Sequence, residues 1–324
     1  MVLLHHASDS LVGERFPDCG YLAVDFFFML SGFVLAAVYE PRFAQGMTFR
    51  PFAAVRLKRL YPTMAIGIVF GALVLGLPTM PLSELWYRLV AQLLFVPIFH
   101  GNDGLYPLDG VQWSLFFEFL ANALHVLVLW RLSNRKLGLV CLLCFLAFLA
   151  ILWSAGDFVH GDRGGNFIGG FPRALFPYTL GILLYRVKDR LPAIEIGAVS
   201  LFIALPAVLI GLDLASLFVA QWVAELLVVA LFFPVLIHLG SQAVTGRLTG
   251  MADAFGRLSY PLYAIHLPML IAFMLIIQSK GLLVLALGMW WAAAGAYYLM
   301  RFTERAAAKA KEKGAPGGHA LRFS

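Results

Sequence analysis

The stretch Gly20-Tyr-Leu-Ala-Val-Asp25-Phe-Phe-Phe-Met-Leu-Ser-Gly-Phe33 sets one carboxylate among aromatic and aliphatic side chains. Its apolar composition predicts a helix that spans a membrane. An ionised Asp25 near the centre of a bilayer is costly unless a partner or water meets it, so the residue is a candidate for function. The structural alternative is that Asp25 locks two helices together. The polar groups elsewhere in the chain bear on whether the role of Asp25 is functional or structural.

The composition of the chain is that of a polytopic membrane protein. Its 324 residues are 61% hydrophobic and 13% charged, whereas a soluble domain is usually under half apolar. The net charge of +6 comes from basic residues in short clusters between apolar runs. Such clusters orient a membrane protein and do not form a nucleic-acid surface. The three cysteines give no disulfide framework, and the Cys-x-x-Cys pair inside an apolar run is interpreted as packing.

Nine apolar runs predict membrane-spanning helices. Residues 1–6 are apolar but too short to cross a bilayer, and we interpret them as the outer end of a first helix truncated at a misassigned start. The expected fold class is therefore an all-α, polytopic membrane helix bundle of about ten transmembrane helices. The nine runs cover residues 20–39, 61–78, 111–131, 137–155, 171–186, 193–212, 216–239, 260–279 and 281–301.

A further apolar run, 84–99, is short and carries Arg88 and Gln92. Basic clusters mark the cytoplasmic side of a membrane, and all five clusters fall on one side only if 84–99 does not cross. We therefore expect 84–99 to be re-entrant or interfacial, with both chain termini in the cytoplasm. The membrane domain is expected over 1–305, followed by a disordered tail over 306–324. The clusters are Arg50/Arg56/Lys58/Arg59, Arg131/Arg135/Lys136, Arg186/Lys188/Arg190, Arg247/Arg257 and Arg301/Arg305/Lys309/Lys311/Lys313.

Helix 111–131 carries a polar stripe. At 100° per residue, Ser114, Glu118, Asn122 and His125 fall within an arc of about 80°. Such a stripe is expected to face the bundle interior or a wet cavity, because lipid would leave its groups unsatisfied. Glu118 alone is also compatible with a simple helix–helix hydrogen bond, but the full stripe favours a cavity.

Two groups of histidines are further candidates. Ser259, Tyr263 and His266 share one face of helix 260–279, and a tyrosine one turn from the histidine favours a polar site there. His5 and His6 are adjacent, so they point about 100° apart and are not expected to enter one cavity. Histidine is the side chain best suited to take a proton near neutral pH.

The remaining polar groups leave the function open. Arg173, near an outer helix end, either binds a phosphate or extends its charge to the membrane surface. Gln221 and Glu225 lie mid-span with no assigned role. The sequence contains no Gly-rich phosphate loop, no His-Glu-x-x-His metal motif and no Gly-x-Ser-x-Gly elbow. The residues alone therefore fit a proton-coupled transporter or flippase as well as an enzyme.

Five motifs in order resemble those of the bacterial integral-membrane acyltransferases known as acyltransferase family three. Gly20–Phe33 is similar to the family's "GVDLFFVLSGF", and Arg56–Pro62 to its "RRLLRIYP". Trp113–Glu118 resembles "WSLSVE", and Ser259–His266 resembles "YPLYLIH". Arg173–Gly181 resembles the family's Arg/Phe/Gly helix start. The resemblance covers nearly the whole chain, and family members typically have ten helices.

The chain departs from the family pattern in three places. The family's first helix has an arginine ten residues before a histidine; His6 matches the histidine, and the arginine position would precede Met1. Phe116 stands where a serine is common, and Phe119 where a second glutamate is common. The acidic site is therefore leaner than the resemblance implies.

The resemblance implies transfer of an acyl group, most often acetyl, from cytosolic acyl-CoA to a hydroxyl of a cell-envelope glycan. It implies a multi-pass protein of the bacterial inner membrane. Its partners would be the lipid bilayer, acyl-CoA as donor substrate and a glycan or glycolipid acceptor, with no bound cofactor, metal or nucleic acid. A sugar hydroxyl is a poor nucleophile and needs a base, and the acyl carbonyl needs charge stabilisation.

Residue roles follow from the resemblance. His6 is the expected general base, or the relay of a covalent acyl intermediate, and His266 is the next candidate base. Asp25 or Glu118 is expected to orient the imidazole and stabilise its cation. The positions expected to contact donor or acceptor are Arg56, Lys58, Arg59, Arg173, Ser114 and Tyr263. For Arg56, Lys58 and Arg59, an equal alternative is a basic cluster that only marks the cytoplasmic side of the membrane.

Overall fold

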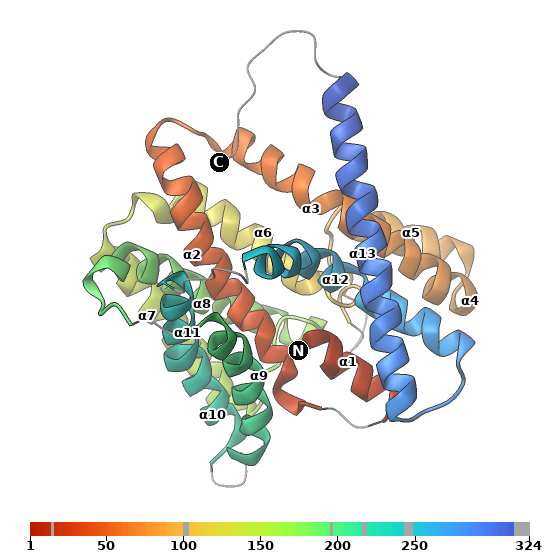
Figure 1. Cartoon of the computed structure of the whole chain (residues 1–324). Helices are drawn as coiled ribbons and strands as arrows, with labels where there is room; N and C mark the ends of the chain where they lie inside the picture. Colours follow the sequence, from red (N-terminus) through yellow and green to blue (C-terminus); the bar gives the residue numbers. More distant parts are fainter. Residues whose placement is uncertain (14–15, 100–103, 195–196, 216–218, 243–248, 314–324) are drawn as a thin grey trace.

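The computed structural model describes residues 1–13, 16–99, 104–194, 197–215, 219–242 and 249–313 (Figure 1). Over these ranges the fold is all-helical, and the single β-bridge, between Gly104 and Arg163, builds no strand. The first helices are α1 (Val2–Leu11), α2 (Leu22–Ala44), α3 (Phe49–Gly71), α4 (Leu77–Thr79), α5 (Leu82–Leu93), α6 (Gln112–Leu127) and α7 (Asn134–Ala155). They are followed by α8 (Gly170–Val187), α9 (Ala198–Ala215), α10 (Gln221–Leu227), α11 (Phe233–Gln242), α12 (Thr249–Ile276) and α13 (Leu282–Lys313).

Seven helical stretches within the described residues are long and apolar enough to cross a membrane. The prediction of a multi-pass helical bundle is thus confirmed. The expected count of about ten is not established, because α1 and α6 have only 10 and 16 residues and the apolar stretch of α9 covers only Val199–Leu212. The seven stretches are Asp18–Ala44, Phe49–Thr79, Asn134–Ala155, Gly164–Arg190, Gln221–Gln242, Thr249–Ile276 and Leu282–Ala306.

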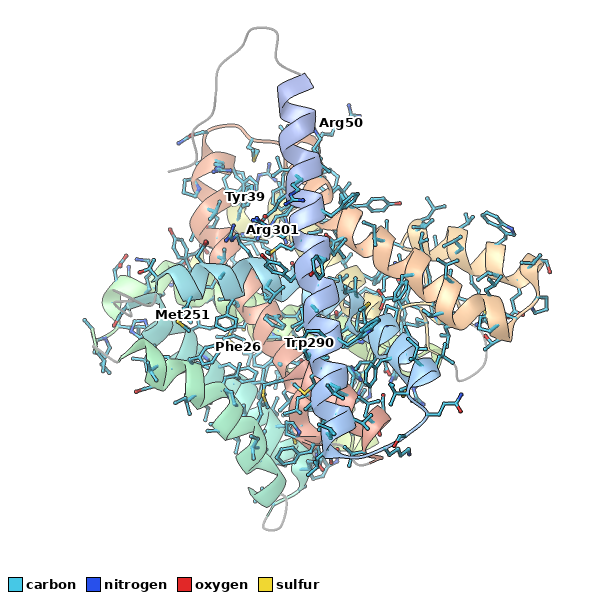
Figure 2. The ribbon with its side chains drawn as sticks, turned by 45° about the vertical axis from the view of Figure 1, so that its right-hand side comes forward. Phe26, Tyr39, Arg50, Met251, Trp290 and Arg301 are labelled. Atoms are coloured by element: carbon cyan, nitrogen blue, oxygen red, sulfur yellow. The ribbon has the colours of Figure 1, made fainter. Side chains whose placement is uncertain are left out.

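Charge distinguishes the two ends of the bundle. Arg50 lies at the end where α13 finishes (Figure 2), and we call this the basic end. At the far end the chain turns from α12 into α13, where the Gly281 N–H donates to the Leu11 carbonyl at 3.0 Å. Helix α13 continues to Lys313, beyond the expected domain boundary at 305, while residues 314–324 lie outside the described residues. Its outer face is apolar, since Trp290 is 69% exposed (Figure 2).

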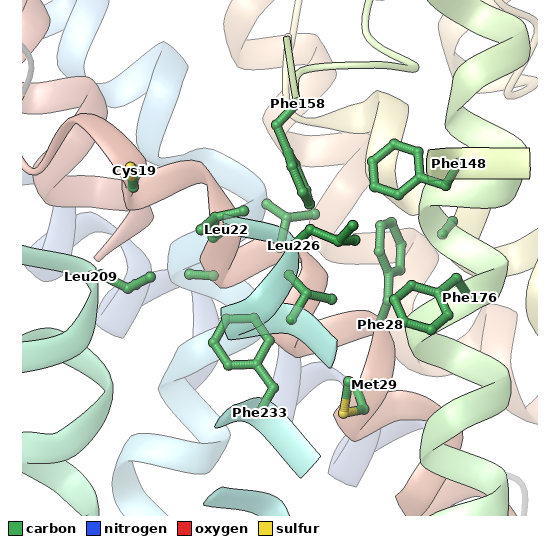
Figure 3. Packing of buried hydrophobic residues seen from close by; sticks show 14 of the residues in the cluster. Cys19, Leu22, Phe28, Met29, Phe148, Phe158, Phe176, Leu209, Leu226 and Phe233 are labelled. Carbon is green, nitrogen blue, oxygen red and sulfur yellow. The ribbon is translucent and has the colours of Figure 1, made fainter. Parts of the chain in front are cut away.

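Helices α2 and α8 approach each other at backbone distance. A Cβ atom on Gly32 would collide with the Tyr178 carbonyl, and one on Gly181 would collide with the Met29 carbonyl. Small residues permit this close approach between helices in membranes. Phe28 and Met29 then enter the apolar core from α2, as Figure 3 shows. The packing of α2 on α8 brings Asp25 next to Arg173.

Helix α5 runs back along α3 instead of forming another span. The Tyr61 hydroxyl donates to the Leu93 carbonyl at 3.1 Å, and Leu108 and Asp109 lie beside the same helix. A Cβ on Gly71 would meet the Leu108 carbonyl, so this return passes close to the α3 backbone. Helix α5 has 12 residues and is not one of the seven membrane-length helices, in agreement with the expectation for 84–99. As a result, α6 begins inside the bundle, where Gln112 is fully buried.

Candidate functional site

A cavity in the half of the bundle near the far end is lined by both N-terminal histidines, and we call it the histidine cavity. Its volume is about 520 Å³. Val2, His5, His6 and Asp9 all line it. The expectation that His5 and His6 would not share a cavity is therefore wrong. These four residues follow the i, i+3, i+4, i+7 pattern of one helix face, and a cavity bordering a whole face accommodates neighbours 100° apart.

The two histidines have different surroundings. His5 is buried, and its Nδ1–H donates to the Pro17 carbonyl at 2.9 Å, which leaves its ring edge-on to Tyr21. His6 is half-buried, and its ring centroid lies 5.3 Å from that of His266. The His266 Nδ1–H donates to the Tyr263 carbonyl at 2.8 Å, because a carbonyl only accepts. The His266 Nε2 is buried and has no hydrogen-bond partner among the described residues.

Asp25 meets Arg173 and not an imidazole. Arg173 Nε donates to Asp25 Oδ1 at 3.1 Å and Nη2 donates to Oδ2 at 2.9 Å, and both side chains are almost fully buried. Arg173 Nη1 also donates to the His160 carbonyl at 3.1 Å, and the guanidinium lies 5.0 Å from the Trp113 ring centroid. The expected alternative that Arg173 extends its charge to the membrane surface is therefore wrong. Arg173 lines the histidine cavity, so the pair fixes a cation at its wall.

A second cavity lies in the half of the bundle near the basic end, and we call it the basic-end cavity. It has a volume of about 230 Å³, and Arg56, Arg59 and Glu118 contribute charge to a mostly apolar lining. Glu118 Oε1 accepts from Arg56 Nη2 at 2.7 Å and from Ser31 Oγ at 3.2 Å. Glu118 is thus neutralised by Arg56 and does not orient a histidine. Lys58 is exposed and does not line this cavity.

The polar stripe of α6 divides between a cavity and the helix interfaces. Ser114 and Glu118 line the basic-end cavity as expected. Further along the helix, Tyr178 on α8 donates to Asn122 Oδ1 at 3.0 Å, and its hydroxyl lies 3.0 Å from His125 Nδ1. These last two stripe residues therefore join α6 to its neighbours, which is the ordinary role of polar side chains between membrane helices.

The two cavities meet at the centre of the bundle. Both are lined by Val24 and Tyr263. The Tyr263 hydroxyl lies 2.5 Å from Ser114 Oγ, which connects α12 to the start of α6. Of the predicted site residues, the structure thus brings His6, Arg173 and Tyr263 to one cavity, and Arg56, Arg59, Glu118, Ser114 and Tyr263 to the other.

Sequence reasoning missed the residues that support the histidine cavity. Tyr21 lines it and donates a short hydrogen bond to Glu225 Oε1, and Cys19 Sγ lies 3.4 Å from the same oxygen. The mid-span position of Glu225 was the available signal, but periodicity did not show that its partner lay 204 residues away. Among the described residues, no three His, Cys, Asp or Glu side chains are grouped so as to hold a metal ion.

Asp109 is a buried carboxyl on the segment that returns from α5 to α6. It is 1% exposed, and neither oxygen has a well-formed hydrogen bond in the described part of the chain, although the Val111 N–H lies close. Burial raises the pKa of Asp109 from 3.8 to about 8. Asp109 is therefore predominantly a neutral acid near pH 7.

The pH dependence of stability is expected to change in Asp109→Asn. Between about pH 4 and pH 8 the unfolded chain has released the Asp109 proton while the folded chain retains it, so this residue makes stability fall as pH rises. The asparagine variant lacks this contribution. Thermal unfolding of the solubilised protein across that range should give a flatter profile for the variant and higher relative stability at pH 8. Parallel profiles would contradict the assignment.

Comparison with known proteins identifies one family and two named relatives. A sequence model described as "Acyltransferase domain" matches residues 1–301. "Protein 2 in picA locus" of Rhizobium radiobacter is 37% identical over 145 residues, which cover 39% of this chain and 74% of that protein. "Exopolysaccharide production protein ExoZ" of Rhizobium meliloti (strain 1021) is 27% identical over 210 residues. The aligned part is 60% of this chain and 60% of ExoZ. No solved structure matches.

Proposed function

This chain belongs to the acyltransferase family that the sequence model describes, and from that premise we propose that it acylates a hydroxyl of a bacterial envelope polysaccharide or glycolipid, with acyl-CoA as donor. The acyl group proposed is acetyl. The printed name of ExoZ, an exopolysaccharide production protein, supports a polysaccharide acceptor. The chain is thus a multi-pass membrane acyltransferase, and its donor and acceptor are the proposal.

One observation carries the proposal: two cavities enter the bundle from opposite halves and share Val24 and Tyr263. A transferase that joins a cytosolic donor to an external acceptor needs this arrangement. On the basis of the positive-inside rule, we propose that the basic end faces the cytoplasm and that the histidine cavity lies in the outer half of the inner membrane. The donor would then enter the basic-end cavity and the acceptor the histidine cavity.

The donor end fits acyl-CoA by charge and shape. Arg59 is exposed at the cavity and Lys58 is exposed beside it, so both are available to the CoA phosphates. Arg56 is held against Glu118, which gives the cavity a fixed hydrogen-bonding group without net charge. The apolar lining, including Phe27 and Phe28, suits a thin pantetheine arm and a short acyl group.

At the acceptor end His6 is the proposed base. It removes the proton of the acceptor hydroxyl as the oxygen attacks the acyl carbonyl, the C–S bond of the thioester breaks, and the CoA thiolate leaves and takes up a proton. Arg173, fixed by Asp25, offers a guanidinium at the cavity wall whose N–H groups are proposed to stabilise negative charge on the substrate. If acyl first passes to His6, the same bonds are exchanged in two steps.

A transfer assay tests this proposal. Purified protein receives acetyl-CoA labelled in the acetyl group and a chemically de-O-acetylated bacterial exopolysaccharide. We expect the label to appear on the polysaccharide as a base-labile ester, with one CoA thiol released per ester formed. Transfer of a longer acyl group instead would correct the donor. Passage of the label into vesicles without thioester cleavage would contradict the enzyme and favour the transporter.

A further inference from the structure

The two cavities adjoin at a wall formed by side chains that both of them share. Val24 from α2 and Tyr263 from α12 line both cavities, so their side chains stand where the cavities would otherwise join. Ser114, at the start of α6, lines the basic-end cavity beside them. Three helices therefore meet at this wall, and the hydroxyls of Tyr263 and Ser114 are the polar groups that hold α12 to α6 there.

Hydrogen bonds fix the tyrosine in this position. Ser114 Oγ donates to the Val111 carbonyl at 3.0 Å, so its single proton is used and Tyr263 O–H must be the donor in the 2.5 Å contact between the two hydroxyls. The Val111 carbonyl also lies 3.4 Å from the Tyr263 hydroxyl. The tyrosine is therefore tied to the first turn of α6 through Ser114, with the Val111 carbonyl next to the same two hydroxyls.

Aromatic packing holds the ring of Tyr263 from two sides. The Phe27 ring lies edge-on at 6.2 Å between centroids, and the His266 ring lies at 5.8 Å. Tyr263 is only partly buried overall, because the cavities leave part of its surface open. The Phe27 and His266 rings thus help to fix the position of the Tyr263 ring.

We propose that Tyr263, held by Ser114, is a barrier that narrows the passage between the two cavities, so that the acyl thioester meets an acceptor hydroxyl bound against this passage in the histidine cavity and free water is kept away. This inference rests on the proposed function and adds a specificity-determining pair to it. With the barrier removed, water from the histidine cavity reaches the thioester. Water then adds to the carbonyl, the C–S bond breaks, and the products are free carboxylic acid and CoA thiol, with protons balanced.

The ratio of hydrolysis to transfer tests the barrier. Tyr263→Ala, assayed with labelled acetyl-CoA and de-O-acetylated exopolysaccharide, is expected to raise the ratio of free acetate to acetyl ester by about tenfold or more. Tyr263→Phe and Ser114→Ala, which remove only the hydrogen bond, are expected to give a smaller rise in the same direction. Tyr298→Ala is the matched control, because this tyrosine is 72% exposed on α13 and lines neither cavity.

The outcomes separate the inference from the proposed function. If wild-type protein transfers acetyl but Tyr263→Ala gives an unchanged ratio, the barrier is overturned and the acyltransferase proposal stands. If wild-type protein neither cleaves acetyl-CoA nor acylates the polysaccharide, the proposed function fails and the inference falls with it. Loss of both activities together in Ser114→Ala and both Tyr263 variants, with folded protein, would assign Tyr263 to catalysis and overturn the barrier.

A second measurement requires no substrate. Vesicles containing wild-type protein and a trapped pH-sensitive dye are expected to hold a proton gradient, because the wall separates the two water-accessible cavities. Vesicles containing Tyr263→Ala are expected to lose the gradient faster, and those containing Tyr298→Ala are not. Equal rates of loss in all three preparations would overturn the inference independently of the transfer assay.

Discussion

Asp25→Ala is expected to lower the free energy of unfolding by about 3–5 kcal/mol, which is the range for removing one partner of a buried ion pair. The pair is almost completely excluded from solvent, with side-chain exposures of 0% for Arg173 and 1% for Asp25. Without the carboxylate, the Arg173 guanidinium keeps, within the described part of the chain, only the His160 carbonyl as a hydrogen-bond acceptor. Unfolding of the detergent-solubilised protein, followed by circular dichroism, measures the loss.

The double variant Asp25→Ala/Arg173→Met is the control for this prediction. Removing both charges leaves no unpaired ion, so most of the lost stability is expected to return. Acyl transfer is not expected to return, because the cavity has then lost its fixed cation. Losses that simply add in the double variant would show that the two side chains contribute separately, which would contradict their role as a pair.

His6→Ala is expected to reduce acyl transfer by about two to four orders of magnitude, the usual contribution of general acid–base catalysis. Stability is expected to change little, because His6 is only half-buried and its side chain borders a cavity. Initial rates of ester formation from labelled acetyl-CoA measure the effect. A covalent route predicts in addition that wild-type protein retains label after a brief exposure to the donor alone, and that His6→Ala does not.

The matched control for His6 is His238→Gln. His238 is also a membrane-bundle histidine, but it lies on α11, where its Nε2 is 3.1 Å from the Pro192 carbonyl, and it lines neither cavity. Its substitution is expected to leave transfer unchanged. Retained turnover in His6→Ala would contradict the assignment and make His266 the base to examine, since its buried Nε2 has no partner among the described residues.

The sequence predicted the helical membrane fold more completely than it predicted the contacts between helices. Seven of the nine apolar runs coincide with helices long enough to cross a membrane, because length and hydropathy are local properties. The placement of basic residues also indicated that 84–99 does not cross, which agrees with the short α5. The partner of Asp25 was not predictable, because Arg173 lies 148 residues away and reaches it through the packing of α2 on α8. Periodicity assigns a residue to a helix face and does not identify the facing helix.

The candidate site was likewise predicted in its local features and not in its contacts between helices. The face of α12 with Tyr263 and His266 was predicted from spacing, and both residues lie near the N-terminal histidines in the structure. The α6 stripe was predicted to face the bundle interior or a cavity, with a cavity favoured. Ser114 and Glu118 line a cavity, whereas Asn122 and His125 contact α8 in the bundle interior, because the neighbours of α6 change along its length. The burial of Asp109 was not predictable, since an aspartate in a connecting segment ordinarily faces water.

The proposed function requires acyl transfer between the two halves of the membrane. Vesicles are prepared with the protein in one orientation, verified by protease access to the segment after α13. Labelled acetyl-CoA is supplied only on the basic-end side and de-O-acetylated exopolysaccharide only on the other. We predict acetyl ester on the polysaccharide in this arrangement and none when the two substrates are exchanged. Ester formation only when both substrates share one side would contradict the account.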